Sequence, residues 1–146
     1  VCSSDLADCA FFIRNHPVLA RGIGNEFEDV SLDLSSYKIA IVKPDVHVST
    51  ALAYKGVVPK VPIKPISEVI RIPVEEWKNE LKNDFELSVF KKYPIIEHIK
   101  LQLYDAGAVY ASMSGSGSAV FGIFKEQPDL AEKFKGYYLW QQTAVG

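Results

Sequence analysis

Two strand-like runs flank a centre of serine and glycine in the stretch "VYASMSGSGSAVFGIF", Val109 to Phe124. Glycine packs nothing in a strand and costs backbone entropy, whereas β-branched and aromatic residues favour strands. Gly115 and Gly117 therefore predict a turn between two strands. Backbone N–H groups and serine hydroxyls in such a turn also suit an anion such as phosphate. Two interpretations stay open: a phosphate-contacting loop, or a tight hairpin that needs glycine at positive φ.

Known short motifs do not decide between these interpretations. A Walker loop needs lysine after its last glycine, and Ser118 stands there instead. A nucleophile elbow needs glycines two residues on either side of its serine, and Ser116 has its glycines immediately adjacent. A serine hydrolase is therefore poorly supported.

The rest of the chain alternates between strand and helix patterns. The strongest helix signal is "PIIEHIKLQLYDAG", where Ile95, Ile99 and Leu103 recur at a spacing of four and Gly107 is the expected stop. Together the patterns predict α+β architecture, a mainly antiparallel sheet with helices on one face, as in a ferredoxin-like split β-α-β domain. Further strands are expected at 10–13, 18–21, 37–44 and 137–145, and further helices at 49–53, 72–84 and 129–135.

Composition excludes several classes of protein. The formal net charge is -2 with no basic block, so nucleic acid is not the expected partner. No apolar run approaches the ~20 residues of a membrane-spanning helix. Cys2 and Cys9 make a poor disulfide framework, and we expect a reducing, cytoplasmic location. His16, His47 and His98 show no metal-ligand spacing, so no metal site is expected from the histidines.

Five stretches, in order along the chain, resemble the small-molecule kinases named for galactokinase, homoserine kinase, mevalonate kinase and phosphomevalonate kinase, the GHMP kinases. The serine–glycine stretch is similar to their third glycine-rich motif. The other four are "ADCAFFI", similar to the segment with the catalytic aspartate, "ARGIGNEFE", "VKPDVHVSTALAY" and "NDFE".

The resemblance implies an ATP-dependent kinase that acts with Mg²⁺ on the 2-hydroxyl of a cytidine-diphosphate-linked methylerythritol, in isoprenoid biosynthesis. It covers the second half of such a kinase. Residues 1–36 are then expected to be the remnant of the N-terminal kinase domain, and 37–146 the C-terminal domain. The missing half would hold the catalytic lysine and the main phosphate loop, so this chain alone is expected to be inactive. Leu6 stands where the family has glycine, so the native sequence is expected to begin near Ala7.

The resemblance also implies roles for single residues. Asp8 is expected to be the catalytic base, the alternative being a surface aspartate. Thr50 is either a substrate-binding residue or a helix cap. Ser114, Gly115, Ser116 and Gly117 are expected to support the phosphate loop of the missing half.

Two further points complete the sequence-based hypotheses. Asn83, Asp84 and Glu86 are expected to satisfy backbone groups at a helix start. The rival to a kinase is a ferredoxin-like ligand-binding or interaction module without catalytic activity. In that case the glycines only shape a turn.

Overall fold

The computed structural model describes residues 16–22, 24, 26–58 and 61–142, and divides the chain into two compact units, 1–33 and 34–146. The assignment of the first part to an N-terminal kinase domain stays a prediction. Among the described residues, no helix combines the length and the apolar character needed to cross a membrane.

The first unit contains one antiparallel hairpin, of β1 (Val18–Arg21) and β2 (Glu26–Asp29). Its turn begins with a hydrogen bond from the Gly24 N–H to the Arg21 carbonyl (3.0 Å). The strand at 18–21 is confirmed, but its described partner is β2, a strand that the sequence patterns missed. The expected strand at 10–13 lies outside the described residues.

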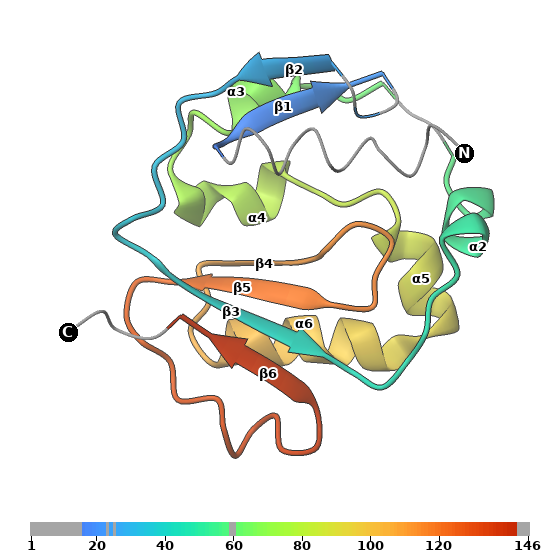
Figure 1. Ribbon diagram of the computed structural model, residues 1–146, viewed down its shortest axis with the longest axis vertical. Coiled ribbons are helices and arrows are strands. Elements are labelled where there is room, and N and C mark those ends of the chain that lie inside the picture. Colours follow the sequence, from blue (N-terminus) through green and yellow to red (C-terminus); the bar gives the residue numbers. More distant parts are fainter. Residues whose placement is uncertain (1–15, 23, 25, 59–60, 143–146) are drawn as a thin grey trace. The chain divides into compact units, whose positions relative to one another are not determined.

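The second unit is built on a four-stranded sheet in the order β4-β5-β3-β6, with every neighbouring pair antiparallel (Figure 1). Counted along this unit, the order is 2-3-1-4, the strand order of the ferredoxin-like fold. The predicted α+β class and split β-α-β arrangement are confirmed. The strands are β3 (Lys38–Lys43), β4 (Tyr110–Met113), β5 (Val120–Phe124) and β6 (Tyr138–Gln141).

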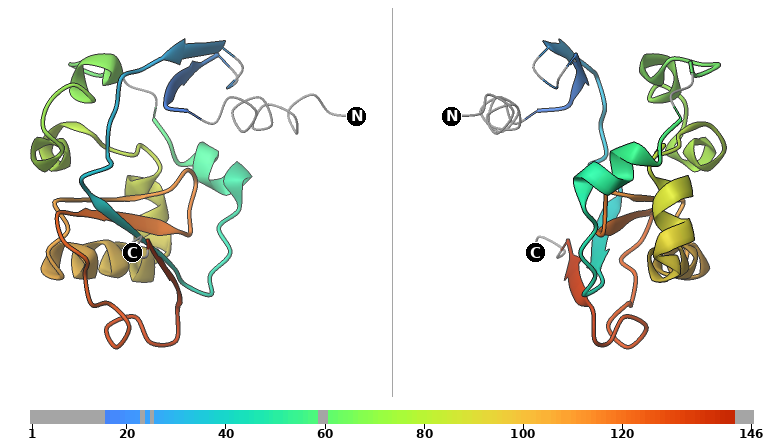
Figure 2. Two further views of the ribbon diagram at one scale, coloured as in Figure 1. Left: turned by 60° about the vertical axis from the view of Figure 1, so that its left-hand side comes forward. Right: turned by 90° about the vertical axis from the view of Figure 1, so that its right-hand side faces the viewer.

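The helices of this unit follow β3 and precede β4, and α5 and α6 cover one face of the sheet (Figure 2). In α6, Pro94 occupies the first turn, and Ile96, Ile99 and Leu103 are fully buried. The helix ends at Asp105, and Gly107 follows its C-cap with a φ of +96°, a conformation that glycine adopts readily. The helices are α2 (Thr50–Lys55), α3 (Ile66–Val69), the 3-10 helix η2 (Val74–Glu76), α4 (Trp77–Glu80), α5 (Glu86–Lys92) and α6 (Pro94–Asp105).

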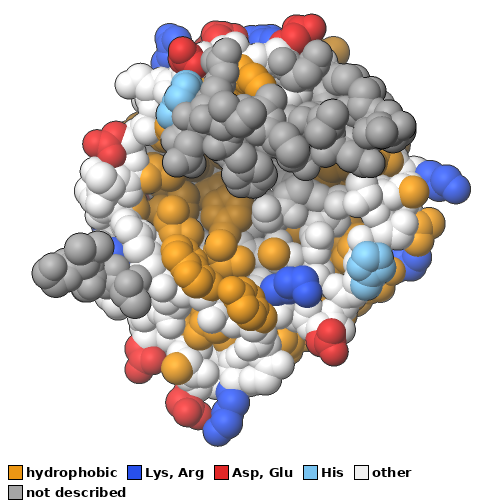
Figure 3. Space-filling view, in the orientation of Figure 1, with side chains coloured by type: hydrophobic (Ala, Val, Ile, Leu, Met, Phe, Trp, Pro, Cys, Tyr) orange, Lys and Arg blue, Asp and Glu red, His pale blue; other side chains and the backbone are white. Residues whose placement is uncertain are grey.

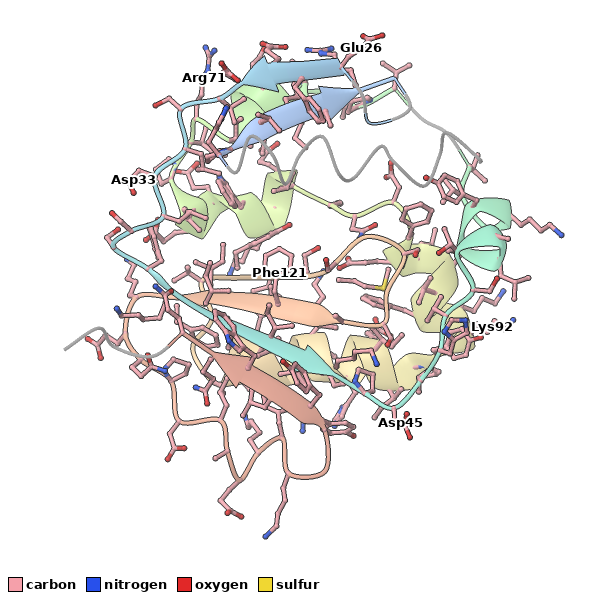
Figure 4. All side chains as sticks on the ribbon, viewed as in Figure 1. Glu26, Asp33, Asp45, Arg71, Lys92 and Phe121 are labelled. Carbon is pink, nitrogen blue, oxygen red and sulfur yellow. The ribbon has the colours of Figure 1, made fainter. Side chains whose placement is uncertain are left out.

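The two faces of the sheet differ in burial. Val42 of β3 is fully buried beneath the helices, whereas its neighbour Ile41, which points to the opposite face, is half-buried. Ile41 pairs directly with Phe121 of β5 and with Trp140 of β6, which is 44% exposed. Figure 3 shows hydrophobic side chains gathered on this second face, and Figure 4 labels Phe121. The helix-covered face therefore forms the main core.

Two predicted helices are wrong in detail. Within the segment 72–84, only 74–80 are helical, as the 3-10 helix η2 followed directly by α4, and the helix does not extend to Asp84. Residues 129–135 form a series of turns, although Leu130 and Phe134 are buried at the expected spacing of four. Pro128 and Gly136 leave room for only two helical turns, which are too few to be stable alone. Burial of the two side chains decides the conformation there.

Candidate functional site

The loop between β4 and β5, residues 114–119, is called the glycine loop below. The Ser114 N–H donates to the Ala119 carbonyl (2.8 Å), which closes the hairpin, and the Gly117 N–H donates to the Ser114 carbonyl (3.0 Å). Gly115 has a φ of +54° and Gly117 a φ of +94°. Both glycines therefore occupy conformations that side chains with a Cβ disfavour. Ser114 and Gly115 are exposed.

The surroundings of the two glycines differ. A Cβ on Gly117 would lie 2.9 Å from the Met113 Sδ and 3.5 Å from the Val48 Cγ2. A Cβ on Gly115 would meet no atom of the described residues within 4 Å. Gly117 is therefore explained by packing within the hairpin, whereas Gly115 faces open space and only its φ favours glycine.

Thr50, the first residue of α2, reaches this loop. Its Oγ1 lies 3.1 Å from the Ser116 Oγ, a distance at which either hydroxyl can donate to the other. Ser49 occupies the N-cap position and makes no side-chain capping bond. The structure thus brings Thr50 and Ser116 together, and the Thr50 hydroxyl contacts the loop.

Asn83, which lies just before α5, binds the end of β4 and the glycine loop. Its Nδ2 donates to the Met113 carbonyl and to the Gly115 carbonyl, both at 2.8 Å. Its Oδ1 accepts the N–H of Phe85 at 2.9 Å, just before α5. The predicted role at a helix start is therefore only part of what Asn83 does.

Glu86 is buried at the start of α5 and binds β4. Its Oε1 accepts the Met113 N–H (2.9 Å) and the Ser112 hydroxyl (3.1 Å). Its Oε2 accepts from the Lys100 Nζ of α6 at 2.6 Å. A buried carboxylate requires such partners, because an unpaired charge there would be costly. Glu86 therefore joins two helices to the strand that leads into the glycine loop.

One hydroxyl of the loop is left unsatisfied. Ser118 is 4% exposed, and its Oγ has no hydrogen-bond partner among the described residues. A buried hydroxyl without a partner destabilises a fold by about 1–3 kcal/mol. The Ser118 hydroxyl therefore does not stabilise the loop and counts against its stability.

Two tyrosines, Tyr110 of β4 and Tyr104 of α6, tie this strand to its neighbours. Burial raises the pKa of Tyr110 to about 12, and its hydroxyl donates to the Leu81 carbonyl (3.3 Å). Burial also raises the pKa of Tyr104, whose hydroxyl donates to the Ala111 carbonyl (3.1 Å). Both stay protonated at neutral pH, so each acts as a donor that holds β4 rather than as a base.

A hollow of about 890 Å³ lies among the helices, bordered by Asn83 and Glu86. Lys78 and Lys82 stand at its margin beside apolar side chains such as Phe90. Of the predicted site residues that the structure describes, Thr50 and 114–117, none lines it. The hollow is therefore distinct from the glycine loop, and the two share only the side chains that bind the loop.

Asp8, the predicted base, lies outside the described residues. Among the residues that the structure describes, no three His, Cys, Asp or Glu side chains form a group that could hold a metal ion. The described part of the site therefore consists of the glycine loop, Thr50, Asn83 and Glu86.

Sequence reasoning placed Asn83 and Glu86 at a helix start and missed their bonds to the loop. One signal was available for Glu86. It occupies a position in α5 that faces inward, beside the buried Val89. A charged residue on the buried side of a helix needs a partner.

Comparison with known proteins gives concordant results. Residues 66–137 match the family model described as GHMP kinases C terminal. A protein of Parabacteroides distasonis named 4-diphosphocytidyl-2-C-methyl-D-erythritol kinase is 52% identical over 143 residues, which cover 97% of this chain and 53% of the relative. A protein of the same name from Bacteroides thetaiotaomicron is 55% identical over 126 residues, which cover 86% of this chain and 46% of that protein.

A solved structure is similar as well. The crystal structure of 4-(cytidine 5'-diphospho)-2C-methyl-D-erythritol kinase superposes with a TM-score of 0.75 and 25% identity, covering 97% of this chain and 56% of the other. The chain thus spans about half the length of the curated relatives it matches.

Proposed function

We propose that the chain belongs to the GHMP kinases and is the C-terminal part of an ATP-dependent kinase for 4-diphosphocytidyl-2-C-methyl-D-erythritol, because residues 66–137 match the model of their C-terminal domain and a relative of that name is 52% identical. The reaction would place a phosphoryl group on the 2-hydroxyl of this alcohol, a step of isoprenoid biosynthesis. The observation that carries the proposal is identity above 50% with relatives of that name across almost the whole chain. It favours a kinase over a binding module without catalytic activity.

The missing half of the protein is the partner that this proposal requires. The relatives are about twice as long as the chain, and the matched family model describes a C-terminal domain. We place the catalytic lysine and the main phosphate loop in the other half. The chain alone is then inactive, and the complete kinase works in the cytoplasm.

The described residues contribute polar groups to the site. The hydroxyls of Thr50 and Ser116, and the exposed Ser114 and Gly115, fit a role beside the phosphate loop or the phosphates of ATP. Mg²⁺ usually accompanies ATP in phosphoryl transfer. Because the described residues form no metal-holding group, they do not fit a resident metal, and Mg²⁺ would come with ATP.

Asp8 would act as the general base that accepts the proton of the substrate hydroxyl. In the proposed step the substrate hydroxyl gives its proton to the Asp8 carboxylate while its oxygen bonds to the γ-phosphorus of ATP. The bond between that phosphorus and the bridging oxygen breaks, and ADP leaves. Positioning and charge stabilisation supply most of the acceleration in such reactions.

The test is an assay of the complete kinase with ATP and 4-diphosphocytidyl-2-C-methyl-D-erythritol, followed by ³¹P NMR of the product. We expect a new phosphomonoester and, for Asp8→Asn, a fall in kcat of about 10²–10⁴-fold with KM little changed. Asp129→Asn, which makes the same chemical change at an exposed residue of the β5–β6 connection, is the matched control and keeps parental kcat. Absence of the phosphomonoester with the parent protein would refute the proposed function.

A further inference from the structure

Two side chains at the start of α5 hold the end of β4 and the glycine loop. We propose that Asn83 and Glu86 are positioning residues of the kinase, which set the place of the glycine loop for phosphoryl transfer. This inference rests on the proposed function. It assigns these residues a role beyond the helix start that their local sequence indicates.

The Asn83 amide is used completely. A neutral amide has two N–H donors and one carbonyl acceptor. The donors bind the carbonyls of Met113, the last residue of β4, and of Gly115, two residues further along the chain. The acceptor binds the Phe85 N–H. One rigid planar group therefore ties the loop to the beginning of α5.

Glu86 binds Met113, the residue whose carbonyl accepts a hydrogen bond from Asn83. Its Oε1 binds both the hydroxyl of Ser112 and the N–H of Met113. Met113 is thus held at its N–H by Glu86 and at its carbonyl by Asn83. A strand residue held on both sides by side chains from another element cannot shift without breaking both contacts. The position of the glycine loop, which begins at the next residue, is therefore fixed by the same contacts.

A helix-start role does not account for these contacts. Capping needs only one acceptor for a free backbone N–H, which serine or aspartate provides equally well. The Asn83 acceptor makes that bond with Phe85. Four further hydrogen bonds of Asn83 and Glu86 end on β4 or the glycine loop instead. These four bonds hold the end of β4 and the glycine loop. The two bonds from Asn83 require a side chain with N–H donors that is long enough to reach both carbonyls.

The test compares Asn83→Asp with Asp84→Asn in the complete kinase. Asn83→Asp keeps the shape and the acceptor for Phe85, but it loses both donors and turns a carboxylate oxygen toward two carbonyls. Asn83→Ser, which keeps a short acceptor without that repulsion, guards against a folding defect. Asp84 is exposed, and among the described residues no hydrogen bond joins its side chain to the loop, so Asp84→Asn is a matched neighbouring control.

Kinetics and hydrogen exchange are measured on all four proteins. A displacement of about 1 Å in a positioned reaction costs ~10²-fold. We expect both Asn83 variants to lose about 100-fold in kcat/KM for ATP. The KM for the alcohol substrate should stay unchanged, because the glycine loop is proposed to act beside the phosphates of ATP. Exchange of the Ser114 and Gly117 amides should accelerate in both. Asp84→Asn should match the parent in every measurement.

Different results would overturn different claims. Unchanged exchange of the loop amides in both Asn83 variants would show that Asn83 does not hold the loop. Kinetics within about threefold of the parent in an active kinase would show that the held position does not matter for transfer. A parent protein without kinase activity would refute the proposed function, and the exchange data would still decide whether Asn83 holds the loop.

Discussion

The glycine loop and the connection between β5 and β6 both lead into or out of β5, yet they are held by opposite means. The β5–β6 connection, residues 125–137, buries its own Leu130 and Phe134 almost completely in the core. The glycine loop buries no large apolar side chain of its own. It is held by Asn83, about 30 residues earlier, and contacted by Thr50, 66 residues from Ser116.

This difference separates a structural connection from a candidate site. A loop fixed by its own apolar side chains is stabilised mainly by burial and keeps its place whatever lies around it. A loop fixed by polar side chains from distant segments can leave some of its own polar groups open to solvent. Ser114 and Gly115 are exposed in this way. The glycine loop is therefore suited to contact with another molecule or another part of the protein.

The largest expected effect comes from breaking the β5–β6 connection. Phe134→Ala removes a side chain that is 1% exposed and should lower the free energy of unfolding of the complete protein by about 3–5 kcal/mol. Urea unfolding measures this loss. The protein that stays folded should keep its kcat/KM for ATP, and a sharp kinetic loss without a stability loss would contradict the distinction between the two loops.

A smaller loss of stability is expected from weakening the contacts of Glu86, which binds the strand that leads into the glycine loop. Glu86→Gln keeps an acceptor for Met113 but leaves the Lys100 ammonium, 21% exposed, without its carboxylate. The free energy of unfolding should fall by about 1–3 kcal/mol. Glu97→Gln on the exposed side of α6 is the control and should change it little. Equal stability of the two variants would mean that the Glu86–Lys100 pair does not hold α5 to α6.

The smallest effect concerns two buried serines, Ser112 and Ser118, each 4% exposed. Ser118→Ala removes a hydroxyl without a described partner and should leave stability unchanged or raise it by up to about 1 kcal/mol. Ser112→Ala removes a donor to Glu86 and should lower stability by about 1 kcal/mol. Thermal melting of both variants compares them directly. A marked loss in Ser118→Ala would reveal a partner for its hydroxyl.

Local patterns sufficed where local forces decide the structure. The spacing of apolar residues and the glycine stop predicted α6, and the two glycines predicted the hairpin of β4 and β5. The helix expected at 129–135 is wrong, because the segment between Pro128 and Gly136 is too short for a helix that is stable by itself, although Leu130 and Phe134 are buried at helical spacing.

The candidate site was only partly accessible from sequence. Thr50 and the serine–glycine stretch were identified, and the structure places their hydroxyls together. The contacts of Asn83 with Met113 and Gly115 could not be foreseen, because they join segments about 30 residues apart through the tertiary fold. The local pattern at Asn83 indicated only a helix start, which accounts for one of its three hydrogen bonds.

The central claim is that the glycine loop serves the active site rather than the hairpin alone. Gly115 and Gly136 provide a matched pair, one in each of the two loops. Each has positive φ, +54° and +91°, and at each a Cβ would meet nothing within 4 Å in the part of the chain that the structure describes. Alanine tolerates the first angle better than the second, since +54° lies close to the left-handed region that L-residues do visit.

The decisive measurement is kcat/KM for ATP and thermal melting of Gly115→Ala and Gly136→Ala in the complete kinase. We predict that Gly136→Ala loses at least as much stability as Gly115→Ala yet keeps parental kcat/KM. Gly115→Ala should stay folded and lose kcat/KM by about 100-fold, because its Cβ enters space needed by the other half or by ATP. Parental kcat/KM in a folded Gly115→Ala protein would contradict the account and leave the glycines as turn residues only.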